Sequence, residues 1–459
     1  MRKYRKYWFC IAALSFFPCF IRLKQNNANW LIWLRVGLER PSSHESSSLR
    51  NARKKNEPFC ITWGKRFGRT EYAEYVRQVV VFEPVSNTGF VNQLRGIVSS
   101  LFYAVLTERD FFINWSEHNS KFNLESYLEP SCLDWRLTNS SIFNEGMETD
   151  QLDRLTISGS RRGMGHPKVS LLLQTKDMNE VYSRDVVVIS SNDLFFDNFF
   201  HNKQYCQKIK TNMHFNHPDE VFKVVFNYLF RPSEELQAIV DNTLYKLEPK
   251  IGIQMRLGGS INDRNFKDPA SKKMAIPNSN RGMFQGCLEH ILGIDRYRHR
   301  TPSRIFVTSD SSDFRKYFSR TRYKLISIEG PVEHTGTSRV THKGLLKVFA
   351  DFIVLSRCEV IVVSPGTFGS GAALAGGSSV FYHVNNSEDA THCTEVVCHQ
   401  DSRYCAFGWS GMGVVTSKKE FRTHLQSSQI WEPYIAMANS EGKTLGNSKI
   451  LLKKLDKCE

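Results

Sequence analysis

A single arginine follows a short apolar strand pattern near the middle of the chain, and two glycines come soon after it. The stretch Ile251–Gly259 has the sequence Ile-Gly-Ile-Gln-Met-Arg-Leu-Gly-Gly. The planar guanidinium of Arg256 can bind a diphosphate through two hydrogen bonds, and Gly258 and Gly259 allow backbone N–H groups to approach the same anion. The alternative is a buried strand and turn in which Arg256 makes an ordinary ion pair, because short glycine-containing motifs often match by chance.

Two further turns have the composition of an anion site, and each follows a predicted strand. The turn Thr88–Arg95 contains Asn92 and Gln93, whose amides can donate hydrogen bonds to substrate oxygens or simply cap the turn. The turn Ser364–Ser370 opens a segment of small residues that can place a helix N-terminus against an anion. The alternative for this segment is that its glycines and alanines only permit tight helix packing.

The hydrophobic pattern places these turns in an α/β protein with two halves. In the first half, a strand at Val79–Phe82, a helix from Phe90 to Thr107 and a strand at Phe111–Ile113 predict a βαβ unit with parallel strands. The other predicted elements are strands at Val186–Ser190, Ile305–Thr308, Lys324–Ile328 and Glu359–Ser364, and helices at Asp219–Tyr228 and Leu345–Ser356. Because ligands of such sheets bind outside the carboxyl ends of the strands, we expect the three turns at one cleft.

The N-terminus determines the predicted compartment. Residues 1–6 are basic and predict a cytosolic tail, residues 7–23 predict a signal-anchor helix, and residues 24–75 have the Ser-rich and basic composition of a stem. The alternative is a cleaved signal peptide, because the apolar run is shorter than the roughly 20 residues that usually span a bilayer. A signal anchor predicts a single-pass type II membrane protein whose remaining residues are lumenal.

Glycosylation sequons and cysteines agree with a lumenal placement. The Asn-x-Ser sequons begin at Asn114, Asn139 and Asn385. Three of the 11 cysteines, Cys393, Cys398 and Cys405, lie close together near the end of the chain. In an oxidising lumen this spacing favours a disulfide-stapled loop over a zinc site.

The charge of the chain does not indicate nucleic-acid binding. The 61 Lys and Arg residues exceed the 46 Asp and Glu residues by 15, but many of them cluster near the N-terminus. An anionic small ligand and an anionic membrane surface explain this balance equally well. No Asp-x-Asp pair ends a strand, and the acidic residues Asp263, Asp268, Asp310 and Asp313 have looser settings, so we predict no metal site.

Three stretches together resemble the GT-B fucosyltransferases, and most of all the plant group that fucosylates xyloglucan. Gly89–Arg109 is similar to the family's Gly-x-x-Asn-[Arg/Gln]-Leu turn and helix, and Ile251–Arg256 to its Ile-Gly-Ile-Gln-x-Arg strand. His342–Gly377 is similar to its His-x-x-Lys-Ala helix and Ser-Thr-Phe-Gly turn. The resemblance covers roughly residues 78–410, with Pro365-Gly366 standing where Trp-Ser is usual.

The resemblance implies a GT-B-like α/β fold of two Rossmann-like domains facing a cleft, after the anchor and stem. Residues 76–245 would form the acceptor side, and residues 246–459 the GDP-sugar side with a C-terminal tail. The implied activity is inverting transfer of L-fucose from GDP-fucose to a glycan or glycoprotein hydroxyl in the Golgi, without a metal or other cofactor. The alternatives are a non-catalytic glycan or nucleotide-sugar binding protein on this fold, and a glycosyltransferase that uses another nucleotide sugar.

The resemblance also implies roles for individual residues. Arg256 would stabilise the charge that grows on the departing diphosphate, and Asp263 would be the general base. Asp351 would accept hydrogen bonds from guanine, with an exposed helix charge as the alternative, and His342 would orient a phosphate or the base or else cap a helix. The full set of implied donor-site residues is Asn92, Gln93, Arg95, Arg256, His342, Asp351, Thr367, Phe368 and Gly369.

Overall fold

The chain packs into two separate units, residues 1–56 and 57–459. The structure is a computed structural model, and it describes residues 20–25, 28–33, 59–67, 78–115, 122–137, 152–157, 167–216, 218–247, 251–258, 283–293, 304–318, 323–336, 340–364, 366–377, 380–383 and 394–397.

The described part of the smaller unit is an antiparallel pair of strands, β1 (Phe20–Gln25) and β2 (Ala28–Trp33). β1 includes residues 20–23, which the sequence predicted as the end of a helical anchor. The extended conformation there fits the alternation of apolar and charged residues from Ile21 to Lys24. Residues 7–19 of the predicted anchor lie outside the described residues. No described helix has both the length and the apolar character needed to cross a bilayer.

The first sheet of the larger unit has the strand order β4-β3-β7-β6, and all its pairings are parallel. Its strands are β3 (Val79–Glu83), β4 (Asp110–Ile113), β6 (Leu152–Ile157) and β7 (Val186–Ser191). The helix α2 (Phe90–Leu106) joins the parallel neighbours β3 and β4, which confirms the predicted βαβ unit. Apolar residues recur along α2 at helical spacing, and almost every side chain of the helix is buried.

The second sheet has the order β11-β10-β9-β12-β13-β14, with only β14 antiparallel to its described neighbour. Its strands are β9 (Ile251–Met255), β10 (Arg304–Ser309), β11 (Lys324–Ile326), β12 (Val360–Val363), β13 (Val380–His383) and β14 (Thr394–Val397). From the central β9 the chain moves outward through β10 and β11, and then returns to the other side of β9 at β12. The strand order therefore reverses between β9 and β12, which is where open α/β sheets bind ligands.

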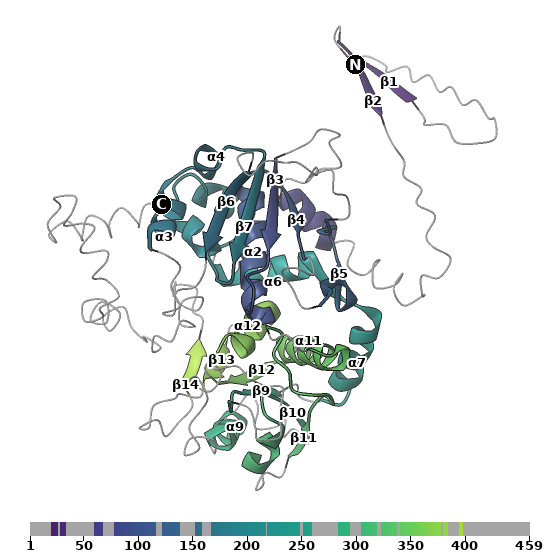
Figure 1. Ribbon diagram of the computed structural model, residues 1–459, viewed down its shortest axis with the longest axis vertical. Helices are drawn as coiled ribbons and strands as arrows, with labels where there is room; N and C mark the ends of the chain where they lie inside the picture. Colours follow the sequence, from purple (N-terminus) through teal and green to yellow (C-terminus); the bar gives the residue numbers. More distant parts are fainter. Residues whose placement is uncertain are drawn as a thin grey trace, which may run out of the picture. The chain divides into compact units, whose positions relative to one another are not determined.

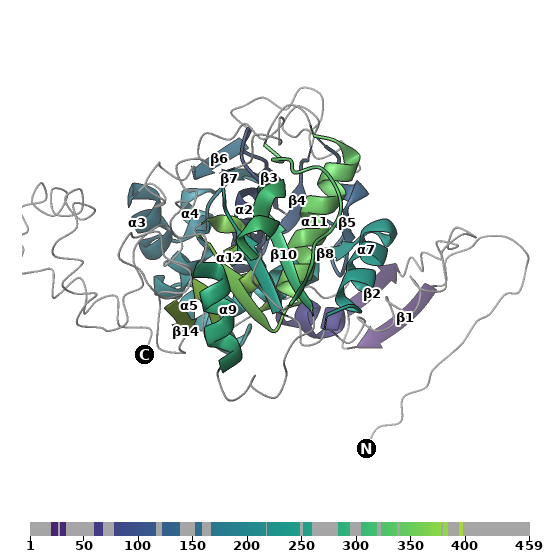
Figure 2. The same cartoon turned by 90° about the horizontal axis from the view of Figure 1, so that it is seen from below.

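The side chains of β9 alternate between the two faces of this sheet. Ile251, Ile253 and Met255 belong to a core that includes α9 (Met283–Gly293) and the short 3-10 helix η5 (Ser312–Phe318). The intervening residues face α11 (His342–Ser356) and α12 (Thr367–Gly376). Figure 2 shows α9 and α11 on either side of β10.

The remaining described helices and strands complete the larger unit. They are η1 (Leu124–Ser126), β5 (Leu128–Pro130), α3 (Pro167–Thr175), α4 (Met178–Val181), η3 (Phe196–His201), α5 (Cys206–Thr211), α6 (Pro218–Leu229), β8 (Phe230–Pro232) and α7 (Glu234–Leu244). β5 and β8 form a small antiparallel pair. α2 and α6 contact α12, and α7 contacts α11, so α11 and α12 lie between the two sheets (Figure 1).

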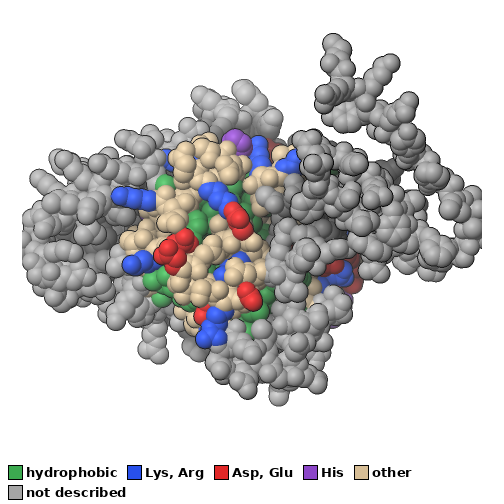
Figure 3. Space-filling view, turned by 90° about the horizontal axis from the view of Figure 1, so that it is seen from above, with side chains coloured by type: hydrophobic (Ala, Val, Ile, Leu, Met, Phe, Trp, Pro, Cys, Tyr) green, Lys and Arg blue, Asp and Glu red, His purple; other side chains and the backbone are tan. Residues whose placement is uncertain are grey.

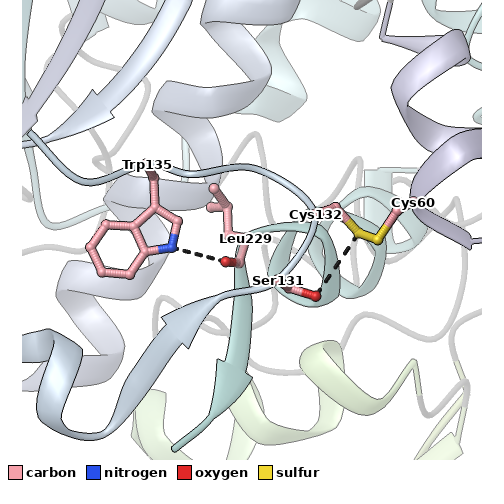
Figure 4. Close-up of a disulfide and its surroundings, with 5 residues drawn as sticks. All are labelled: Cys60, Ser131, Cys132, Trp135 and Leu229. Atoms are coloured by element: carbon pink, nitrogen blue, oxygen red, sulfur yellow. Dashed lines mark hydrogen bonds between the residues drawn. A yellow bond between two sulfur atoms is a disulfide. The ribbon is translucent and has the colours of Figure 1, made fainter. Parts of the chain in front are cut away.

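A disulfide attaches the segment 59–67, which is helical over residues 59–66, to the loop after β5. Cys60 is bonded to Cys132, 72 residues further along the chain. Beside it, the indole N–H of Trp135 donates to the carbonyl of Leu229 at 2.9 Å, which fixes the loop to the end of α6 (Figure 4). Cys206 and Cys287 are also disulfide-bonded, whereas the buried Cys358 is not part of a disulfide and its Sγ donates to the carbonyl of Val354.

Candidate functional site

Two of the three turns predicted from the sequence meet at the carboxyl ends of the neighbouring strands β9 and β12. Arg256 directly follows β9, and Ser364 directly follows β12. The backbone N–H of Arg256 donates to the hydroxyl of Ser364 at 2.7 Å, and this hydroxyl donates to Oε1 of Gln254 at 3.0 Å. The predicted juxtaposition of Arg256 with the turn before α12 is therefore present, and Arg256 is half-buried there.

The N–H of Gly258, predicted to approach a ligand anion, is bound to a side chain of the protein. The N–H of Leu257 donates to Oδ1 of Asp310 at 2.6 Å, and that of Gly258 donates to Oδ2 at 3.1 Å. The carboxylate thus takes the place expected for a ligand anion. Gly258 is still required by conformation, because its φ of +81° lies in the left-handed region. Gly259 lies outside the described residues.

The N-terminus of α12 keeps the features of an anion site. Its first residue, Thr367, follows Gly366, which has a φ of +136° and no side chain that could cap the helix, and the first turn contains no acidic residue. The N–H groups of such a turn and the helix dipole together favour an anion. At Gly369, an added Cβ would lie 2.7 Å from Val363 and 2.9 Å from Gln254, so glycine allows the helix to sit close to the strand ends. The Phe368 ring instead packs edge-on against Phe352.

Asp351 on α11 belongs to a buried cluster of polar side chains, which lies next to the ends of β9 and β10. Its Oδ2 accepts from Lys347 Nζ at 2.6 Å and from Thr308 Oγ1 at 2.8 Å. Thr308 is the register partner of Gln254 on the neighbouring strand. Oδ1 is buried without a hydrogen-bond partner among the described residues. Burial raises the pKa of Asp351, and the Lys347 ammonium opposes that rise. The exposed helix charge that was the alternative for Asp351 is therefore wrong.

Asn92 and Gln93 are neighbours on α2, but their side chains have different hydrogen-bond environments. Both ends of the Gln93 amide bind the preceding turn: Oε1 accepts from the N–H of Val85 at 3.0 Å, and Nε2 donates to Val85 and Thr88. Gln93 therefore caps the turn, and the predicted ligand contact is not supported. The Oδ1 atom of Asn92 is buried and has no hydrogen-bond partner within the described part of the chain.

Arg95, predicted to contact the donor substrate, forms an ion pair with Asp193. Its Nη2 lies 2.5 Å from Oδ1 of Asp193, which follows β7. Burial raises the pKa of Asp193, an effect that Arg95 opposes. Nearby, burial raises the pKa of Asp197 to about 7. The ion pair between Arg95 and Asp193 joins α2 to the residues after β7.

His342, predicted to orient a phosphate or the base, binds two side chains of the protein. One ring nitrogen bonds the hydroxyl of Tyr127 at 2.9 Å, and the other bonds Glu235 at 3.1 Å. The N-cap of α11 is Thr341, whose hydroxyl accepts from the N–H of Gly344 at 3.1 Å. His342 thus connects α11 to the other half of the unit and to α7, and it is not the capping residue.

Three residues without a predicted role act near these turns. Thr335 accepts the N–H of Phe90 at 2.6 Å, so the N-terminus of α2 is capped from the other half. Glu333 accepts the N–H of Thr341 at 2.7 Å. Asp310 holds the loop after β9. No local pattern marks Glu333 or Thr335, because each is defined by a partner brought close by folding.

Two predictions, the general base and the absence of a metal site, do not depend on the geometry described above. Asp263 lies outside the described residues, so its role stays a prediction. Among the described residues, no three His, Cys, Asp or Glu side chains gather in a way that could hold a metal ion. A pocket of about 450 Å³ opens at the other end of the second sheet, between α6 and the C-terminal ends of α11 and α12. Because it lies away from the strand ends, it is not the predicted ligand site.

Comparison with known proteins supports the fold. No protein-family model matches the sequence, and no curated protein matches it significantly. A single-residue mutant of FUT1 from Arabidopsis thaliana, solved in complex with GDP, matches with a TM-score of 0.50 and 17% identity over 78% of this chain and 84% of that chain. The fucosyltransferase NodZ from Bradyrhizobium matches with a TM-score of 0.43 and 14% identity over 70% and 99%. POFUT1 matches with a TM-score of 0.37 and 11% identity over 67% and 96%.

At 17% identity, the match to FUT1 is evidence for the fold alone. Two mainly parallel sheets, with α11 and α12 packed between them, account for the match over most of both chains. The chain therefore has the GT-B fold of fucosyltransferases, as the sequence motifs predicted.

Proposed function

We propose that this protein transfers L-fucose from GDP-fucose to a glycan hydroxyl, with inversion at the sugar carbon and without a metal. The observation that carries the proposal is the hydrogen bond from the backbone N–H of Arg256, at the end of β9, to Ser364, in the segment that leads to the N-terminus of α12, at the point where the strand order reverses. A guanidinium and free N–H groups are the donors that a diphosphate leaving group requires. FUT1, which shares the fold, was solved in complex with GDP.

The reaction breaks the bond between the fucose C1 and the β-phosphate oxygen while the acceptor oxygen bonds to C1 from the opposite side. Negative charge grows on the GDP as that bond breaks, and Arg256 and the first turn of α12 stabilise it most in the transition state. The acceptor proton passes to a general base. Asp263 is the proposed base.

Guanine recognition is proposed for Asp351. A carboxylate oxygen can accept the N1–H and amino N–H of guanine, and Oδ1 of Asp351 is the acceptor left without a hydrogen bond among the described residues. Asn92 on α2 supplies a second such atom, and we assign it to hydroxyls of the sugar or the acceptor.

The proposal includes a placement in the Golgi membrane. Residues 1–6 would be cytosolic, residues 7–23 would anchor the chain, and residues 24–75 would form the stem. Residues 76–245 would then bind the acceptor and residues 246–459 the GDP-sugar. The disulfide between Cys60 and Cys132 supports an oxidising lumen. On the face shown in Figure 3, the described Lys, Arg, Asp and Glu side chains are interspersed, and no single-sign stripe of the kind used for nucleic acid is visible.

The test uses the full-length chain, GDP-fucose and a panel of galactose-ended glycans, with GDP release and product mass as readouts. Replacing one transition-state donor typically costs on the order of a hundredfold in rate, so Arg256→Ala should lose about that much. Arg357→Ala, at the far end of α11, is the matched control and should keep wild-type turnover. Chelator should not change the rate.

Each alternative has its own outcome in this test. Glycan binding without GDP release over a long incubation would identify a non-catalytic binding protein. Preference for UDP-sugars over GDP-fucose would identify another glycosyltransferase. Normal turnover by Arg256→Ala would end the proposed mechanism, and loss of activity with chelator that Mn²⁺ restores would end its metal independence.

A further inference from the structure

Three successive backbone N–H groups after β9 donate to side chains of the two neighbouring strand ends. The N–H of Arg256 donates to Ser364, and those of Leu257 and Gly258 donate to the two carboxylate oxygens of Asp310. The donor–acceptor distances are 2.7, 2.6 and 3.1 Å. Every backbone donor from Arg256 to Gly258 is thus bound to a side chain.

The two acceptors hold the loop from opposite sides. Ser364 follows β12 and Asp310 follows β10, and β9 lies between these strands. Ser364 is 1% exposed, and its own N–H also donates to the carbonyl of Gln254 at 3.1 Å. On the other side, the hydroxyl of Ser309 donates to the carbonyl of Met255 at 3.0 Å. The loop is therefore attached at the end of β9 and again beyond it.

We infer that Asp310 and Ser364 form a loop clamp that positions Arg256 for catalysis. This inference rests on the proposed function. A loop containing a glycine at positive φ has many alternative conformations, and the clamp selects one of them before substrate arrives. Asp310 would otherwise place a negative charge near the departing diphosphate, but its two bound N–H groups offset part of that charge. Asp310 is thus a positioning residue and neither a metal ligand nor a base.

A clamp that acts through Arg256 predicts a specific pattern of kinetics. Ser364→Ala and Asp310→Asn should each lower kcat by about tenfold, the effect of losing roughly one hydrogen bond. The affinity for GDP should change by less than about threefold, because Arg256 acts mainly in the transition state. Ser364→Thr keeps the hydroxyl and should retain most of the activity. Ser356→Ala, a buried serine at the far end of α11, and Asp313→Asn, three residues beyond Asp310, are the matched controls.

The deciding measurement is a double-mutant cycle with Arg256→Ala, done on the full-length chain. If the clamp acts through Arg256, adding Ser364→Ala or Asp310→Asn to Arg256→Ala should cost less than about twofold more. Full additivity would overturn the inference, because it would show that the two residues act independently of the guanidinium. Thermal melting of each variant checks that it folds.

Backbone hydrogen exchange tests the clamp without activity. Amides of residues 256–258 should exchange faster in Ser364→Ala and Asp310→Asn than in the wild type, and should be unchanged in both controls. Unchanged exchange in the clamp variants would overturn the inference. If the wild-type chain neither binds GDP nor turns over any nucleotide sugar, the proposed function fails, while the exchange data still decide whether the clamp orders the loop.

Discussion

Only one oxygen of the Asp351 carboxylate has hydrogen-bond partners among the described residues. Oδ2 is held by Lys347 and Thr308, whereas Oδ1 has no partner among the described residues. If Oδ1 accepts the N1–H and amino group of guanine, an amide in its place should instead prefer xanthine, which carries a carbonyl where guanine carries the amino group.

Asp351→Asn should therefore weaken GDP binding by at least about tenfold and strengthen binding of xanthosine diphosphate relative to GDP. Competition against GDP-fucose turnover, or thermal shift with each nucleotide, measures this preference. Asp241→Asn on α7, whose carboxylate is exposed, is the control and should leave the preference unchanged. Retained GDP preference in Asp351→Asn would remove guanine recognition from this residue.

Asp197 gives the unit a pH dependence of unusual sign. Its pKa of about 7 is raised by burial, beside Asp193 and Arg95, above the roughly 3.9 of an unfolded aspartate. Between these two values the folded chain holds a proton that the unfolded chain has released, so this group lowers stability as pH rises from about 4 to 7. The loss is at most about 4 kcal/mol.

Asp197→Asn removes this titration. The variant should be close to wild type in stability near pH 4 and increasingly more stable than wild type up to about pH 7, with no further gain above it. Urea unfolding at several pH values measures the difference, and the exposed Asp185→Asn serves as control. A stability difference that is the same at every pH would contradict the assignment.

The sequence could predict which residues end the strands but not which side chains they meet. Arg256 and Thr367 follow apolar runs of strand length, so their place at the carboxyl ends of β9 and β12 follows from local pattern. The partners of Arg95 and His342 lie 98, 215 and 107 residues away in the chain. No local rule relates residues so distant, so the sequence could not predict these partners, and the ligand contacts of Arg95 and His342 stay predictions.

At the scale of elements, periodicity predicted type better than boundaries. α2, β9 and β12 lie within one residue of their expected limits. α11 begins at His342, three residues before the predicted start, because Thr341 and Glu333 cap it. β11 ends at Ile326, two residues short of the prediction, and pairs with β10 over three residues. Caps and pairing partners set these limits, and neither appears in hydrophobic spacing.

The small residues of α12 permit close helix packing, which was the alternative interpretation of that segment. A Cβ at Gly371 would overlap Val91 on α2. Gly286 on α9 is a matched site, because no atom of the described residues lies within 4 Å of a Cβ added there. The packing contact uses the later turns of α12, and the proposed anion site uses its first turn.

Gly371→Ala should therefore destabilise the unit, by about 1–3 kcal/mol, since overpacking forces neighbouring side chains to move. Gly286→Ala should instead be neutral or stabilising by up to about 1 kcal/mol, because alanine is the better helix former. Urea unfolding of the two variants provides the comparison. Equal effects at both positions would show that α12 and α2 are not in close contact.

At the scale of the whole larger unit, the two sheets share one apolar core. The Phe90 ring of α2 lies 4.3 Å from that of Phe349 and 5.8 Å from that of Phe352, both on α11. A continuous cluster of buried side chains includes residues of α2, α6, α11 and α12. Sequence patterns showed that each of these helices is apolar, but they could not identify the partner of each face. The shared core indicates that the two halves unfold together.

The disulfide extends this unit toward the N-terminus. Cys60 and Cys132 close a loop with a sequence separation of 72 residues, and the segment 59–67 packs Trp63 and Phe67 against Phe215 and Tyr228. In the chain-entropy account, a crosslink across a loop of this length stabilises the fold by about 4 kcal/mol. The disulfide should therefore contribute much of the free energy that holds segment 59–67 against the rest of the unit.

Replacing both cysteines, Cys60→Ser with Cys132→Ser, should lower the melting temperature of the full-length chain by several degrees and make residues 59–67 accessible to protease before the rest unfolds. Thermal melting and limited proteolysis measure the two effects. Cys358→Ser is the control, because this buried thiol is not part of a disulfide and its loss should not change protection of the segment. If the double variant melts and is cleaved like the wild type, apolar packing alone holds the segment, and the disulfide contributes nothing measurable to the unit.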